Sequence, residues 1–189
     1  MAAFDHVVIL LSFVYALALT HLLSRMAGML FARERVRFSG LLFFWMIAAI
    51  LLVFLNWLSL WDAHGMRVWS LYSIVMQFLF AVAQYFVCAM AAPEYPAEGV
   101  IDMEALFWRT RGPLYGLLLA VSLLAILANM DLMQVNAAMF FRQNILILVF
   151  SLPIGLALAV RARWAQWTVV LGYLTNCVIF LALFETALH

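Results

Sequence analysis

The side chains that could do chemistry in this chain are few, and two glutamines of the third hydrophobic run have the most regular spacing. Gln77 and Gln84 lie seven residues apart, and Ser70, Ser73 and Cys88 follow the same intervals of three and four. On a helix these residues share one face. Amide groups deep in a bilayer need partners, so this face either bonds to other helices or lines a pore or cavity for a neutral solute or a hydrated ion.

Two further polar residues, Thr20 and Asn56, are candidates for lining such a path beside the glutamines. His21 is a candidate pH-sensitive group or inner gate, because an unperturbed imidazole titrates near pH 6.5, at roughly physiological pH. It precedes Arg25 by four residues and therefore shares its helical face. The alternative is a histidine that bonds to a neighbouring helix, beside an arginine that reaches the lipid headgroups.

Sequence motifs typical of enzymes and cofactor sites are absent. The chain contains no Cys-x-x-Cys, His-Glu-x-x-His, glycine-rich phosphate loop or Gly-x-Ser-x-Gly, and no nucleophile–base pair or set of metal ligands is visible. His6 and His64 are predicted at the same membrane face, where solvated histidines are commoner than haem ligands. We therefore expect neither an enzyme nor a cofactor or metal. Nucleic acid is not an expected partner either, because no basic patch stands apart from the helix ends.

A ridge of small residues in the first hydrophobic run, residues 4–28, predicts a packing face. Small residues let helix backbones approach closely, which promotes helix association in lipid. We expect the ridge to face another helix, with the rest of the chain arranged around it. Its members recur at intervals of four: Ser12, Ala16, Thr20, Ser24 and Gly28.

The composition requires a membrane. Hydrophobic residues make up 69% and charged residues 10% of the 189 residues, against roughly 45–50% and 25% in soluble domains. A span needs about 20 mostly apolar residues. The chain is therefore predicted to be one all-α domain over residues 1–189, a polytopic bundle of six transmembrane helices in a lipid bilayer. The predicted spans are residues 5–27, 40–61, 69–91, 112–130, 138–160 and 165–186.

Prolines and acidic residues predict how the later spans begin and end. The connection over residues 93–104 is predicted to be a solvated loop, because its prolines stop the preceding helix. Asp102 is predicted to begin an interfacial entry into the fourth span. Pro113 is placed in the first turn of that span, and Pro153 in the interior of the fifth span.

The arginines predict the orientation. All ten basic residues are arginines, and eight of them fall in three connections on one side of the predicted membrane. By the positive-inside rule that side faces the cytoplasm, so both termini are predicted outside, in a bacterial cytoplasmic membrane. The eight are Arg25, Arg33, Arg35, Arg37, Arg109, Arg111, Arg161 and Arg163, and the other two are Arg67 and Arg142.

Four segments together resemble an uncharacterised bacterial family of small six-span membrane proteins. The resemblance covers most of the first four spans and implies the six-span fold, but it implies no activity. A more distant similarity links the chain to six-span bacterial potassium channels of the lysosomal-channel type, whose first helix begins Phe-Ser-Asp where this chain has Phe4-Asp5. The four segments are LALTHLLSR (17–25), RERVRF (33–38), NWLSLWD (56–62) and FWRTRGPLYGLL (107–118).

Two functions from different classes follow from these observations. In the first, the chain is a subunit of a homo-oligomeric channel or small-solute transporter whose polar faces line the path. In the second, it is a non-conducting scaffold or accessory subunit of a membrane complex, and its polar residues only hold helices together. A water-filled path lined by Gln77 and Gln84 would distinguish the first from the second.

Overall fold

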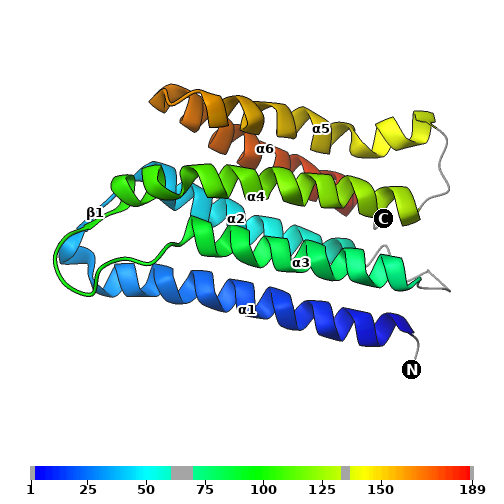
Figure 1. The fold of residues 1–189 in the computed structure, drawn as a ribbon, viewed down its shortest axis with the longest axis horizontal. Helices are drawn as coiled ribbons and strands as arrows, with labels where there is room; N and C mark the ends of the chain where they lie inside the picture. The colour runs from blue at the N-terminus through cyan, green and yellow to red at the C-terminus, as the bar shows by residue number, and fades with distance from the viewer. Residues whose placement is uncertain (1–2, 61–69, 133–136, 188–189) are drawn as a thin grey trace.

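A computed structural model describes residues 3–60, 70–132 and 137–187. It shows an all-α bundle of six helices lying side by side (Figure 1). Five helices are long and apolar enough to cross a membrane, and the described part of the remaining one contributes the shorter apolar segment Ile147–Ala159. The helices are α1 (Ala3–Phe31), α2 (Gly40–Ser59), α3 (Leu71–Ala91), α4 (Met103–Leu132), α5 (Ala137–Ala159) and α6 (Arg163–Ala187).

The chain runs back and forth along the bundle, so the two termini lie at the same end (Figure 1). The opposite end carries the α1–α2, α3–α4 and α5–α6 connections, and with them the eight arginines assigned to one side. We call it the arginine-rich end. Arg67 and the side chain of Arg142, assigned to the other side, lie outside the described residues, as does His64.

Helix α2, and not α1, is the centre of the bundle. It contacts α1, α3, α4 and α6, and it is the most buried of the five long apolar helices. Leu42, Trp45 and Val53 on α2 are almost completely buried. The expectation that the first hydrophobic run organises the chain is therefore corrected: α1 packs on α3 and on α2.

Helix α4 begins nine residues before the predicted span, which was expected to start at residue 112. The Asp102 carboxylate accepts hydrogen bonds from the backbone N–H groups of Glu104, at 3.0 Å, and Ala105, at 2.9 Å. It therefore bonds to two N–H groups of the first helical turn, which have no partner within the helix. Pro113 consequently lies inside α4 and not in its first turn, which corrects the prediction, whereas Pro153 lies inside α5 as predicted.

A short pair of parallel strands joins two connections at the arginine-rich end. After α1 the chain forms a 3-10 helix, η1 (Arg33–Arg35), and then β1 (Val36–Arg37), which pairs with β2 (Ile101–Asp102) just before α4. Ile101 is fully buried and Pro93 is buried. The connection is therefore docked on the bundle at its two ends, while Glu94 and residues 96–100 are exposed, as predicted for a solvated loop.

Candidate functional site

The α3–α4 connection, residues 92–102, is held on α1 by one arginine and one aromatic ring. Arg25 Nη2 lies 2.9 Å from Glu94 Oε1, and the Arg25 guanidinium lies over the Tyr95 ring, 5.7 Å from its centroid. The Tyr95 hydroxyl packs against Gly28, where a Cβ atom would clash with it. The absence of a side chain at Gly28 therefore leaves room for the end of the Tyr95 side chain at this point of the ridge.

Other arginines of this end bond to the same connection or to the helix that follows it. Most of these side chains are exposed, so each bond contributes little stability by itself. Together they link segments that are distant in sequence. The bonds are Arg109 Nη2 to the Glu94 carbonyl at 2.9 Å, Arg35 Nη1 to the Ala97 carbonyl at 2.8 Å, Arg37 to Asp102 at 3.8 Å and Arg163 to Glu104 at 3.0 Å.

His21 lies on the side of α1 that meets α3. It is half-buried, and its ring centroid is 6.1 Å from that of Tyr85 on α3, with the two rings tilted by 54°. His21 therefore contacts a neighbouring helix, as in the alternative, but the contact shown is between rings, and Arg25 pairs with Glu94. A role as a pH-sensitive group stays a prediction.

Arg111 on α4 is buried, with 7% of its surface exposed, and it binds the C-terminal end of α5. Its guanidinium donates to the backbone carbonyl groups of Ala157, Leu158 (3.2 Å) and Val160 (3.1 Å). These carbonyls have no partner within the helix, because α5 ends at Ala159. A cation here also complements the negative end of the helix dipole. Arg111 thereby satisfies groups that would be costly in an apolar environment.

Gln166 on α6 completes this arrangement. It is fully buried, and its Nε2 donates to the carbonyls of Val160, at 2.7 Å, and Ala157, at 3.4 Å. Its Oε1 accepts a hydrogen bond of 2.8 Å from the Tyr115 hydroxyl. The Trp45 ring of α2 packs edge-on against Tyr115, with centroids 5.4 Å apart. We call Arg111, Gln166 and Tyr115 the α5 cap.

The sequence interpretation missed the α5 cap, because it used Arg111 only to assign orientation. One signal could have found it. Arg111 lies three, seven and ten residues before Leu114, Leu118 and Val121, which form the buried stripe of α4. A charged residue in register with a buried apolar stripe needs a partner inside the bundle.

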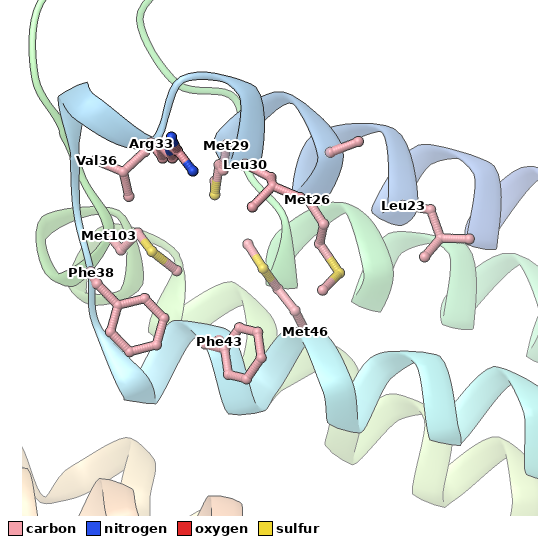
Figure 2. A pocket seen from close by; sticks show the side chains of 11 residues that line it. Leu23, Met26, Met29, Leu30, Arg33, Val36, Phe38, Phe43, Met46 and Met103 are labelled. Carbon is pink, nitrogen blue, oxygen red and sulfur yellow. The ribbon is translucent and has the colours of Figure 1, made fainter.

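A lateral crevice of about 630 Å³ opens at the arginine-rich end, between α1 and α2 (Figure 2). Its inner wall carries the buried methionines Met29, Met46 and Met103, which come from three different helices. Its mouth carries Leu30 and Phe38, which are each 70% exposed. A volume of this size lies within the usual range of small-molecule sites, and the lining is almost entirely apolar.

One arginine belongs to the crevice. Arg33, the first residue of η1, lines it beside Val36 and Met29 (Figure 2). The same arginine and Leu30 also line an adjoining hollow of about 640 Å³, whose other residues include Glu34 and are more polar. The apolar crevice therefore continues into the more polar hollow at the level where α1 ends.

A smaller cavity of about 170 Å³ lies inside the bundle among α2, α3, α4, α5 and α6. Asn56, Ser122 and Asn176 are among its lining residues. Asn56 Nδ2 donates to the Leu52 carbonyl at 2.8 Å, and Ser122 Oγ donates to the Leu118 carbonyl at 3.0 Å. Their donors thus bond to their own helices, while Asn176 Oδ1 has no partner among the described residues.

The four candidate pore residues have four different environments. Gln84 is fully buried and interacts with the Tyr15 hydroxyl of α1, but neither its amide nitrogen nor its oxygen forms a hydrogen bond of standard geometry within the described chain. Gln77, about two helical turns from Gln84, is half-buried, and Thr20 is exposed. Asn56 lines the interior cavity. The structure therefore brings none of them together in either cavity described above.

The small-residue ridge of α1 is split. Ser12 accepts a hydrogen bond of 3.3 Å from Trp57 Nε1 of α2, and Gly28 contacts Tyr95. Ala16, Thr20 and Ser24, between them, are exposed. The expectation of a continuous ridge against another helix of this chain is corrected: the buried stripe of α1 is instead Val7, Leu11, Tyr15, Ala18, Leu22 and Met29. Leucine and tyrosine of α1 fill the space between these helices, and the contact at Gly28 is made by the Tyr95 side chain.

No protein-family model, no curated protein and no solved structure matches this chain. The resemblance carried by residues 17–118 therefore identifies no family. What the chain itself shows is a multi-span membrane protein with five long apolar helices.

Proposed function

We propose that this integral membrane protein is a non-conducting accessory or scaffold subunit of a membrane complex, and that its polar side chains hold the bundle together. The observation that carries the proposal is the α5 cap. Arg111 and Gln166, the two long polar side chains most deeply placed on α4 and α6, both bind the carbonyl end of α5. Their bonding capacity is used between helices of the same chain, as expected of structural groups in a membrane interior.

The arginine-rich end supports the same proposal. Its ion pairs and side-chain-to-backbone bonds fix the α3–α4 connection against α1 and α4, and join α6 to the first turn of α4. A fixed surface of this kind suits attachment to other components better than it suits gating, which requires a segment with two arrangements.

The channel or transporter hypothesis keeps one supporting observation, the interior cavity lined by Asn56 and Asn176. Uncharged amides at such a place could hold water or a small neutral solute. In this alternative several copies assemble, and the exposed Ala16, Thr20 and Ser24 of α1 would lie between copies.

Ion flux in liposomes distinguishes the two functions. Purified protein is reconstituted, and potassium and sodium flux are measured for the parent, Asn56→Leu and Gln77→Leu. We expect no flux above protein-free liposomes. Flux in the parent that Asn56→Leu abolishes and Gln77→Leu leaves unchanged would contradict the scaffold function and favour the cavity as part of a path.

The proposed orientation places the arginine-rich end in the cytoplasm of a bacterial cell, with both termini outside, because eight of the ten arginines lie there. It is tested by Glu34→Cys in a chain whose Cys88 and Cys177 are replaced by alanine. A membrane-impermeant maleimide should label this cysteine only after the membrane is opened. Labelling of intact cells would reverse the orientation.

A further inference from the structure

The lateral crevice between α1 and α2 follows the last turns of α1. It extends from Leu23 to Arg33, and α1 itself ends at Phe31. The helical part of this range rises about 12 Å, at about 1.5 Å per residue. Its charged end lies just beyond the apolar span of α1, which also ends at Phe31. The crevice thus runs along the arginine-rich end of that span, up to the level at which a lipid headgroup is expected.

The sides of the crevice fit a flexible apolar chain. Methionine sulfur and methylene groups adapt to an occupant whose shape is not fixed, and Figure 2 shows Met26 of α1 and Met46 of α2 extending toward each other. Leu23, Leu30 and Phe38 at the mouth are exposed, with more than half of their surface free. In a membrane such a mouth opens toward lipid tails, so an occupant can enter sideways.

The positive charge at the end of the crevice, on Arg33, is free to bind a ligand. Arg33 is exposed and forms no ion pair or side-chain hydrogen bond within the part of the chain that the structure describes. Its neighbours are engaged: Arg35 donates to the Ala97 carbonyl, and Arg37 faces Asp102. Glu34 lines the adjoining hollow and is the nearest acid along the chain. A guanidinium with free donors is suited to binding a phosphate group.

We propose that the crevice binds an anionic phospholipid of the leaflet at the arginine-rich end. One acyl chain lies along α1 against the buried methionines, and the headgroup phosphate contacts Arg33. The complementarity of an apolar crevice and a free cation at its polar end selects this occupant over a neutral lipid or a second copy of the chain. Binding would anchor the α1–α2 connection at the membrane surface.

Lipid-dependent stability tests the proposal with the full chain in detergent. Thermal unfolding is followed during titration with dioctanoyl phosphatidylglycerol and, separately, dioctanoyl phosphatidylcholine. We expect the anionic lipid to bind about fivefold more tightly, the effect of one arginine beside an anionic headgroup. Arg33→Gln should make the two lipids equal, while Arg161→Gln, an exposed arginine at the same end, should keep the preference.

A second pair of variants tests the apolar part. Met26→Trp should fill the crevice and lower the affinity for both lipids at least tenfold, while Leu17→Trp, an exposed α1 position away from the crevice, should leave both affinities unchanged. The proposal is overturned if the parent shows no preference, or if Arg33→Gln keeps it. It is also overturned if Met26→Trp binds lipid like the parent. If Met26→Trp changes only the oligomeric state of the protein in detergent, the occupant is a second copy of the chain and the proposal is overturned as well.

Discussion

Long polar side chains are buried at two seams of the bundle, by which we mean the contacts between neighbouring helices. The two seams differ in the hydrogen bonds that these side chains form. At the α4–α5–α6 seam, Arg111 and Gln166 bind carbonyl groups at the end of α5, and the Tyr115 hydroxyl is bonded as well. At the α1–α3 seam, Gln84 is fully buried beside Tyr15, but neither its amide nitrogen nor its oxygen has a hydrogen bond among the described residues.

The difference lies in what the two side chains meet. A helix end offers four carbonyl groups without partners, whereas the middle of a helix has already paired its backbone groups. Gln84 faces the middle of α1, so only another side chain could satisfy it. We therefore expect a buried polar residue to stabilise this bundle more where it meets a helix end than where it meets the side of a helix. The following predictions test that distinction, from the largest expected effect to the smallest.

Arg111→Met should have the largest effect. It leaves the α5 carbonyls that Arg111 binds without that donor, and each unsatisfied buried acceptor costs about 1–3 kcal/mol. We expect the free energy of unfolding to fall by about 3 kcal/mol or more, measured by thermal unfolding in detergent. Arg161→Gln, which removes the same charge from an exposed position nearby, is the matched control. Equal losses in the two variants would show that charge, and not the helix end, matters.

Gln166→Leu should cost less, because Arg111 still binds the same carbonyls. The Tyr115 hydroxyl loses its acceptor, which is the principal loss, and we expect a decrease of about 2 kcal/mol. Adding Tyr115→Phe should recover part of this loss, since the unpaired hydroxyl is then absent. A double variant no more stable than Gln166→Leu would contradict the role assigned to this pair.

Gly28→Ala tests the docked connection at the inner end of the α1–α3 seam. The added methyl group meets the Tyr95 hydroxyl, so we expect a loss of about 1 kcal/mol from overpacking. Tyr95→Phe removes the hydroxyl and should restore the stability of Gly28→Ala. If alanine is tolerated without that second change, the connection is not packed on α1 as described.

Arg25→Gln should have a small effect, below about 1 kcal/mol, because Glu94 is 85% exposed and such pairs are weak. The loss should shrink further in 1 M salt. A salt-independent loss comparable to that of Arg111→Met would mean that the α1–α3 seam depends on this pair.

Much of the fold follows from the sequence because the apolar runs leave the chain few choices. The helix ends of five predicted spans lie within a few residues of the observed ones, and α4 begins where the interfacial entry at Asp102 was predicted. The position of Pro113 was not predicted, because residues 103–111 mix charged and aromatic side chains and extend the helix before the apolar run.

The site was less predictable because it depends on which faces meet. A ridge of small residues predicted the packing face of α1, yet Leu11, Tyr15 and Leu22 pack there instead. Spacing alone identifies a helical face but not its neighbour. The crevice is formed by residues of α1, β1, α2 and α4, and its free arginine is recognised only after the partners of Arg35 and Arg37 are known.

The most direct test of the distinction between helix ends and helix sides is the stability of Gln84→Leu, measured beside Arg111→Met in the same detergent. Because the Gln84 amide lies beside the Tyr15 hydroxyl without a hydrogen bond of standard geometry, an apolar side chain of similar size removes a poorly satisfied group. We predict that the melting temperature stays unchanged or rises, while that of Arg111→Met falls. A fall in Gln84→Leu as large as in Arg111→Met would contradict the account, because it would show that Gln84 stabilises the bundle without a helix end to bind.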